Sequence, residues 1–130
     1  MQDDDYRMYV FVRNDLDSLS VGKIAAQVHH TATHFMYFNR FLLDTDPFKT
    51  WLQSGGGFGT VLTMNGGDTP EEFFSKLDFY MDRYKDGKAI GGIVKDPTYP
   101  VRDGKTTHLI NLITSFYVFT NEKLEEEKLL

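Results

Sequence analysis

The helix start around Lys23 combines residue types that favour binding over helix stability. Gly22 and Lys23 fall in the first turn after Ser20. Glycine weakens a helix at this point, and lysine faces the positive end of the helix dipole. Free backbone N–H groups beside a cation form a site for an anion such as phosphate. Because a sequence under pressure for helix stability alone would carry Asp or Glu here, the pattern indicates function.

The same helix is predicted to carry one polar face. Lys23, Gln27, His30 and His34 follow helical spacing, and the opposite face is apolar, with Ile24, Ala25, Val28, Ala32, Phe35 and Met36. The polar face either belongs to the site or is simply solvated, since spacing alone does not separate these alternatives. His30 and His34 have the spacing of metal ligands, but two ligands without a third do not predict a metal site.

The helix start is expected at one edge of a sheet. Residues 6–13 form an almost continuously apolar strand, residues 14–19 a turn, and Ser20 an N-cap. In open α/β sheets, ligands bind outside the carboxyl ends of the strands, which places Lys23 at such an edge. This is not a nucleotide P-loop, because the upstream glycine is missing and Ile24 replaces the metal-binding Ser or Thr.

Further elements follow in the order β-α-β-α-β-β. The first helix is predicted to run from 21 to near 43 with a break, and the next begins at Thr69, a threonine cap before proline. A short helical piece is expected at 48–52, a loop at 96–104, and strands at 60–64, 89–94 and 108–119, the last one bulged. Helical crossovers make the first three strands parallel, and the fourth is antiparallel. The predicted class is α/β, with a four-stranded mixed sheet and helices on both faces.

Composition restricts the chemistry and the partners. With 130 residues the chain fits one domain, and the lack of cysteine excludes disulfides, zinc–thiolate sites and thiol nucleophiles. The net charge of −5 comes from Asp3, Asp4 and Asp5 and from the C-terminal tail, which leaves residues 6–120 formally neutral. No basic stripe for tight non-specific nucleic-acid binding is visible.

Three segments are expected: an acidic disordered leader at 1–5, an α/β domain at 6–120 and a charged tail at 121–130. The acidic leader is the reverse of a targeting sequence, so a cytoplasmic protein without a membrane span is predicted.

Two motifs resemble the second-type peptidyl-tRNA hydrolases. They are Arg13-Asn-Asp-Leu16 and Gly22-Lys-Ile-Ala-Ala-Gln-Val-His-His30. That family has an Arg-x-Asp-Leu turn and a Gly-Lys-x-Ala-Ala-Gln-x-x-His helix. The resemblance implies a small mixed sheet flanked by helices. It also implies hydrolysis of the ester between a peptide and the 3′ ribose of tRNA, without metal or other cofactor. The implied partner is the acceptor end of peptidyl-tRNA, and a homodimer is left open.

The second half matches the family less closely. The family has Asp-Ala-Gly-Arg-Thr after the third strand and Gly-Thr-x-Thr at the start of the last strand. Asp96 matches the aspartate and Thr107 the last threonine, whereas residues 96–100 read Asp-Pro-Thr-Tyr-Pro. The family's additional lysine upstream of Gly-Lys is also absent. These departures leave an alternative open, a tRNA- or phosphate-binding module that keeps the fold and has lost hydrolysis.

The resemblance implies a catalytic set of Lys23, Gln27, Asp96 and Thr107. Lys23 would bind a phosphate or stabilise the oxyanion, Gln27 would hold the ester or the attacking water, and Asp96 would orient water or pair with Lys23. The alternatives are a solvated lysine, a surface amide and a turn aspartate. Thr107 would hydrogen-bond the substrate carbonyl or merely close a loop.

A second set is expected to bind substrate, namely Gly22, His30, Lys95 and Thr98. His30 would donate to a phosphate, act as a base or have a structural role. Thr98 stands in for the family's loop threonine. Asp15 is expected to order the turn before Lys23 rather than to take part in the chemistry.

Overall fold

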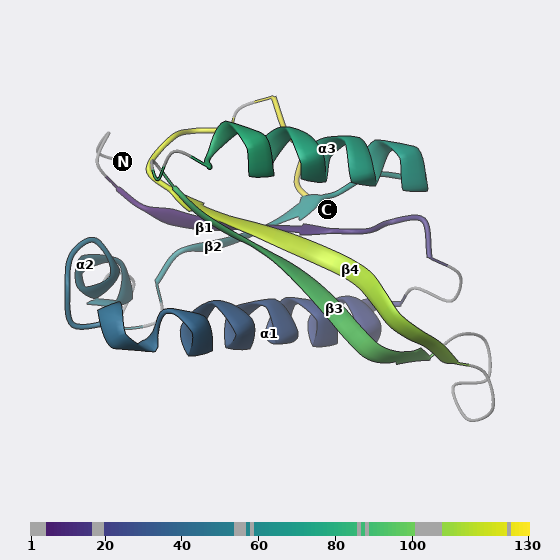
Figure 1. The fold of residues 1–130 in the computed structure, drawn as a ribbon, viewed down its shortest axis with the longest axis horizontal. Helices are drawn as coiled ribbons and strands as arrows, with labels where there is room; N and C mark the ends of the chain where they lie inside the picture. The colour runs from purple at the N-terminus through teal and green to yellow at the C-terminus, as the bar shows by residue number, and fades with distance from the viewer. Residues whose placement is uncertain are drawn as a thin grey trace.

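The computed structural model describes residues 5–16, 20–53, 57, 59–85, 87, 89–100, 108–124 and 126–130, with backbone only at 98, 100 and 108–110. One four-stranded sheet has the order β2-β1-β4-β3 (Figure 1). Its strands are β1 (Arg7–Val12), β2 (Val61–Asn65), β3 (Ile90–Pro100) and β4 (His108–Thr120). β1 pairs with β2 in parallel, and β4 is antiparallel to both β1 and β3. The predicted three parallel strands and antiparallel fourth strand are confirmed.

Helices cover both faces of the sheet, as predicted (Figure 1). α1 (Val21–Phe38) and α2 (Phe48–Gln53) lie on one face, and α3 (Pro70–Arg83) lies on the other. The expected break in the first helix occurs at Asn39, which precedes the short 3-10 helix η1 (Arg40–Leu42). Thr69 caps α3 by accepting a hydrogen bond from the Glu72 backbone N–H, so the predicted threonine cap is confirmed.

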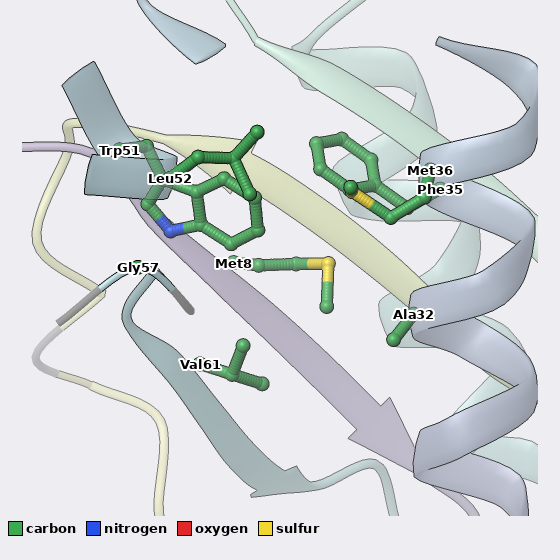
Figure 2. Close-up of a pocket in the computed structure, with 8 residues that line it drawn as sticks. All are labelled: Met8, Ala32, Phe35, Met36, Trp51, Leu52, Gly57 and Val61. Atoms are coloured by element: carbon green, nitrogen blue, oxygen red, sulfur yellow. The ribbon is translucent and has the colours of Figure 1, made fainter. Parts of the chain in front are cut away.

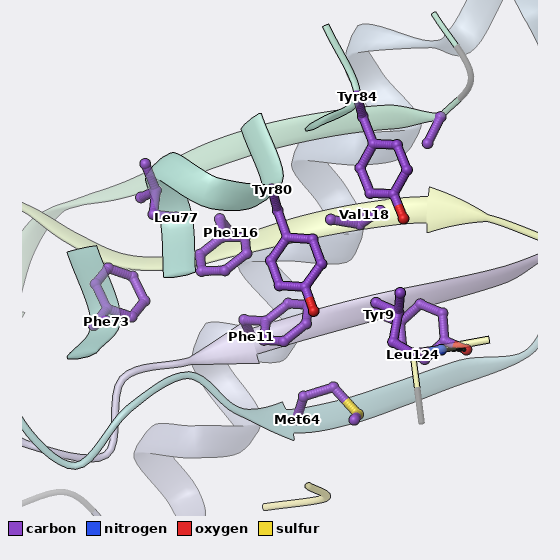
Figure 3. Packing of buried hydrophobic residues seen from close by; sticks show 11 residues of the cluster. Tyr9, Phe11, Met64, Phe73, Leu77, Tyr80, Tyr84, Phe116, Val118 and Leu124 are labelled. Atoms are coloured by element: carbon purple, nitrogen blue, oxygen red, sulfur yellow. Dashed lines mark hydrogen bonds between the residues drawn. The ribbon is translucent and has the colours of Figure 1, made fainter. Parts of the chain in front are cut away.

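Alternating strand residues supply two separate cores. On β1, Met8, Val10 and Val12 pack toward α1 and α2, whereas Tyr9 and Phe11 pack toward α3. The α3 core is rich in aromatic rings (Figure 3). There the rings of Phe11 and Phe116 stack with centroids 4.6 Å apart. These two layers fix the register of β1 and hence the place where the chain leaves it toward α1.

The third strand is longer than predicted. The loop expected at 96–104 is wrong over residues 96–100, because β3 continues to Pro100 and Asp96 lies inside it. Pro97 and Pro100 suggested a loop, yet β3 is an edge strand, where a missing backbone N–H need not break the sheet. As a result β3 and β4 extend together beyond β1 and β2, and both contact α1 (Figure 1).

A β-bulge interrupts the β3–β4 pairing next to Asp96, as expected for the last strand. Val94 lies opposite Ser115 and Lys95 opposite Ile113, so Thr114 is the extra residue. The neighbouring side chains of Thr114 and Ser115 both reach α1, where they hydrogen-bond to Gln27 and Thr31. A regular strand would send these two side chains to opposite faces. The bulge therefore redirects one side chain into the space between β4 and α1.

The described part of the C-terminal segment packs on the edge of the sheet. Leu124 is buried, and Leu129 forms an antiparallel bridge with Met64 of β2. Glu127 forms an ion pair with Lys76 of α3 at 2.6 Å and accepts a hydrogen bond from Tyr80. Residues 1–4 of the expected leader lie outside the described residues. Among the described helices, none has the length and apolar character needed to cross a membrane.

Candidate functional site

The start of α1 is capped and open. Ser20 has extended backbone angles, and its hydroxyl accepts a hydrogen bond from the Lys23 backbone N–H at 3.4 Å, which confirms the predicted N-cap. The first turn contains no acidic residue, and among the described residues a Cβ added at Gly22 would meet only the Ser20 hydroxyl, at 4.0 Å. The Lys23 ammonium lies 5.6 Å from the centre of the Tyr99 ring of β3. A ligand at this helix end would therefore meet a cation beside a backbone that no other described side chain covers at Gly22.

One turn further along α1, three buried polar side chains are joined to one another. The Gln27 amide nitrogen donates to Asp96 Oδ2 at 2.8 Å, and the Gln27 amide oxygen accepts from Thr114 Oγ1 at 2.6 Å. Gln27, Asp96 and Thr114 are 3%, 7% and 0% exposed. The Asp96 carboxylate, which only accepts, fixes the amide nitrogen toward itself, and the Thr114 hydroxyl then donates to the amide oxygen.

The burial of Gln27 settles one of the alternatives left by the sequence. The solvated alternative is wrong for Gln27, because the extended β3–β4 pair covers this side of α1. His30, on the predicted polar face, is exposed, and Ala25, expected on the apolar face, is exposed as well. The actual buried stripe of α1 consists of Gln27, Thr31 and Phe35. Helical periodicity located the helix but not the strand pair that packs on it.

Polar pairing continues along α1 and β4 beyond Gln27. Thr31 Oγ1 and Ser115 Oγ lie 2.7 Å apart, and His34 Nδ1 lies 3.0 Å from the Tyr117 hydroxyl. Burial lowers the pKa of His34 and raises the pKa of Tyr117 to about 12. At neutral pH the pair is therefore a neutral histidine beside a protonated tyrosine, and the tautomer of His34 decides which of the two donates. These pairs hold α1 in register with β4.

A salt bridge lies at the start of the turn between β1 and α1. Arg13 Nε donates to Asp15 Oδ1 at 2.9 Å and Arg13 Nη2 to Oδ2 at 2.6 Å, in a fork geometry. Arg13 Nη1 also donates to the Ile113 carbonyl of β4 at 3.2 Å, and the guanidinium lies over the rings of Phe73 and Phe74. Asp15 is thus a paired residue, and its role in ordering the turn before Lys23 stays a prediction, because residues 17–19 of that turn lie outside the described residues.

The structure brings together only part of the predicted site. Lys23, Gln27 and Asp96 lie on facing parts of α1 and β3, with Gln27 rather than Lys23 bonded to Asp96. Lys95 is exposed on β3. The Thr98 backbone pairs with Ile110, and Thr107 lies outside the described residues.

Two residues of this region, Thr114 and Tyr99, were not expected from the sequence. Thr114 looked like an ordinary strand residue, and Tyr99 looked like part of a loop. The sequence signal for Thr114 is the asparagine three residues earlier. In the structure this residue, Asn111, has a φ of 53°. Glycine favours that conformation, and asparagine is one of the few other residues that adopt it.

The described residues also contain an apolar pocket away from these polar groups. It has a volume of about 260 Å³ and lies between α1, α2 and the first two strands (Figure 2). Its lining is apolar, with Met8, Ala32, Phe35, Met36, Trp51, Leu52, Gly57 and Val61. Trp51 Nε1 already donates to the Thr60 carbonyl. The pocket contributes no acid, base or cation, so it is not the candidate catalytic site. Within the described part of the chain, no cluster of three potential metal ligands occurs.

The helix start lies within a region that matches the model of a known protein family. The family model described as peptidyl-tRNA hydrolase PTH2 matches residues 6–77, which is more than half of the chain. The chain belongs to the PTH2 family. The matched region runs from β1 into α3 and contains Gly22, Lys23, Gln27 and His30. Asp96 and Thr114 of this PTH2 protein lie beyond it. A comparison with curated proteins found no match.

Proposed function

We propose that this PTH2 protein hydrolyses the ester bond between peptide and tRNA in peptidyl-tRNA, acting on the acceptor end in the cytoplasm. The observation that carries the proposal is the juxtaposition of the Lys23 helix start with the buried Gln27–Asp96 pair. Family membership supports peptidyl-tRNA hydrolysis at the family level. The juxtaposition supports it in this chain, because it supplies a cation for an oxyanion or phosphate beside a carboxylate for water.

In this proposal Lys23 binds the negatively charged group of the substrate. Its ammonium and the first backbone N–H groups of α1 favour negative charge at one place. In ester hydrolysis, negative charge develops on the carbonyl oxygen as water adds to the carbon. Among the described residues, only the Ser20 hydroxyl comes within 4.0 Å of a Cβ added at Gly22, which favours close approach of a substrate to the backbone there. Lys23 therefore stabilises the oxyanion, or binds the phosphate next to it.

In this proposal Asp96 orients and activates the attacking water. Its carboxylate accepts from the Gln27 amide, which holds the carboxylate in place inside a buried site. A carboxylate in hydrogen-bond reach of water orients it and accepts its proton as the oxygen attacks. The new C–O bond forms at the ester carbon, and the bond to the ribose 3′ oxygen breaks. The proton then passes to that leaving oxygen, which leaves a peptide acid and a free tRNA 3′ hydroxyl.

Thr114 is assigned the threonine role in place of Thr107. It is bonded to Gln27 and follows Asn111 by three residues, the spacing between Gly and the last Thr in the Gly-Thr-x-Thr pattern. The positive φ of Asn111 suits a position where the pattern has glycine. Thr114 therefore orients the Gln27 amide, and through it the carboxylate of Asp96.

A second candidate is a tRNA- or phosphate-binding module without hydrolysis. It is favoured by one observation, that the family match ends at residue 77 and does not include Asp96 or Thr114. In this alternative Lys23 and the α1 start retain an anion, and the β3–β4 groups are structural.

An assay with N-acetyl-aminoacyl-tRNA separates the two candidates. The purified protein should release the acyl amino acid in the presence of EDTA, and Asp96→Asn should slow the release at least tenfold. Activity that vanishes with EDTA and returns with magnesium or zinc would contradict the proposal. Absence of turnover with retained tRNA binding would establish the binding module.

A further inference from the structure

The hydroxyl of Tyr99 is a buried donor whose partner the described residues do not supply. Tyr99 is 0% exposed, and its hydroxyl has no hydrogen-bond partner among them. Buried polar groups are nearly always paired, because an unpaired one loses its water without compensation. Since the Tyr99 ring lies beside Lys23 and the charges of Asp96 and Asp15 act on the hydroxyl, its missing partner points to a ligand of the candidate site.

The surroundings of Tyr99 keep it in the donor form. Burial and the nearby carboxylates of Asp96 and Asp15 raise the pKa of Tyr99. The hydroxyl therefore stays protonated at neutral pH. Asp96 and Asp15 are themselves bonded to Gln27 and to Arg13. On the ring side, Tyr99 faces the Lys23 ammonium at 5.6 Å from the ring centre.

The two carboxylates also restrict the chemistry of the partner. An anionic ligand group at the Tyr99 hydroxyl would be repelled by the negative charges of Asp96 and Asp15. A phosphate of the substrate would be attracted to the Lys23 ammonium rather than to this hydroxyl. A neutral oxygen avoids this repulsion. We propose that Tyr99 is a substrate-binding residue whose hydroxyl donates a hydrogen bond to a neutral substrate oxygen beside Lys23. This proposal rests on the proposed function, and the oxygen is then the carbonyl of the acyl group or a ribose hydroxyl.

Tyr99→Phe removes the hydroxyl and leaves the ring beside Lys23. The variant should unfold at a temperature equal to or a few degrees above that of the wild type, because an unpaired buried donor is gone. Its kcat/KM on N-acetyl-aminoacyl-tRNA should fall about tenfold, the factor that corresponds to one ordinary hydrogen bond. A purely structural tyrosine would not combine preserved stability with lost kcat/KM.

Tyr84→Phe is the matched control. Tyr84 is also a buried tyrosine, but it belongs to the core on the α3 face, where its hydroxyl is close to that of Thr120 (Figure 3). Its loss should leave kcat/KM unchanged. A drop in kcat/KM for Tyr84→Phe as large as that for Tyr99→Phe would contradict a specific role of Tyr99.

Calorimetric binding separates this proposal from the proposed function. The probe is adenosine whose 3′ position carries an N-acetyl amino acid through an amide, which resists hydrolysis, and plain adenosine is compared with it. Tyr99→Phe should bind the acylated probe about tenfold more weakly, and equal loss for adenosine would identify a ribose hydroxyl as the acceptor. If the wild type binds the probe but hydrolyses nothing, the proposed function fails while Tyr99 is still tested. The Tyr99 assignment would be overturned if Tyr99→Phe kept the wild-type affinity for the acylated probe, kept the wild-type kcat/KM or was destabilised. Both proposals would be overturned if the wild type neither bound the probe nor hydrolysed N-acetyl-aminoacyl-tRNA.

Discussion

At the scale of single residues, Lys23 stands at a helix start, where the helix dipole disfavours a cation. The Tyr99 ring beside it offers a cation–π contact, which at a partly exposed site amounts to about 0.5–1 kcal/mol. That gain is close to the cost of a lysine at the positive end of a helix dipole, about 0.3–1 kcal/mol. The two effects roughly cancel, so the stability of the fold should be nearly independent of this side chain.

Lys23→Ala should therefore separate activity from stability. We expect turnover of N-acetyl-aminoacyl-tRNA to fall by about 100-fold or more, the size of losing one electrostatic stabiliser, with the unfolding midpoint unchanged. Thr69→Ala is the control, because it removes the cap of α3 and should cost about 1 kcal/mol of stability without touching turnover. Wild-type turnover in Lys23→Ala would refute the site assignment.

Thr114→Val tests the neighbouring buried set. Valine keeps the shape but leaves the Gln27 amide oxygen without its hydroxyl partner, which costs about 1–3 kcal/mol for a buried acceptor. The freed amide should also orient Asp96 less well, so kcat should fall, whereas Thr114→Ser, which keeps the hydroxyl, should restore most of it. Thr31→Val is the comparison, since it breaks the Ser115 pair one turn away without touching Gln27 Oε1. Equal losses of kcat in both valine variants would argue against a specific role of Thr114.

At the scale of elements, α1 and β4 are joined by polar pairs whose protonation matters. Burial lowers the pKa of His34 in the folded protein below its value in the unfolded chain, near 6.5. As the pH falls below that value, the unfolded state binds more protons than the folded state, so the folded state is stabilised less. The contribution is fully present above about pH 6.5 and is lost on acidification through the folded pKa.

His34→Gln should remove this part of the acid sensitivity. Thermal unfolding between pH 5 and pH 7 should show a smaller drop of the midpoint for His34→Gln than for the wild type. His30→Gln, at an exposed position on the same helix, should keep the wild-type drop. A wild-type midpoint that rises on acidification over this range would contradict the direction of the pKa shift.

The helices and strands also show how much of the fold could be predicted from the sequence. Caps at Ser20 and Thr69 and the apolar run of β1 are local signals, and they placed α1, α3 and β1 correctly along the chain. Asp96 was assigned to a loop because proline is a strong local signal, whereas its place on an edge strand is a property of the whole sheet. Thr114 and Gln27 are 87 positions apart, and the bulge that joins them depends on the register between β3 and β4. No local pattern contains that register.

At the scale of the whole molecule, the excess negative charge lies in two segments, residues 3–5 and residues 121–130. Part of the C-terminal acidity belongs to the fold, since Glu127 pairs with Lys76 and Glu122 with Arg83. Removing this segment would remove its charges and would also uncover the edge of β2, because the Leu130 N–H donates to the Thr63 carbonyl. Truncation of the segment therefore confuses electrostatics with stability. The charges of Asp3, Asp4 and Asp5 at the other end can be neutralised by substitution instead.

Binding of tRNA should depend only weakly on salt. Residues 6–120 are formally neutral, so no broad basic surface draws the phosphate backbone, and we expect about three phosphate contacts around Lys23. The slope of log K against log salt concentration should then be roughly −2 to −3. Replacing Asp3, Asp4 and Asp5 by asparagine should tighten binding a few-fold at low salt, through reduced long-range repulsion, and the gain should disappear above about 0.3 M salt as screening shortens the reach of charge. The Lys23→Ala variant should lower the magnitude of the slope by about one contact. A slope steeper than about −6, or affinity unaffected by both changes, would mean that a folded basic surface other than the α1 start binds the tRNA.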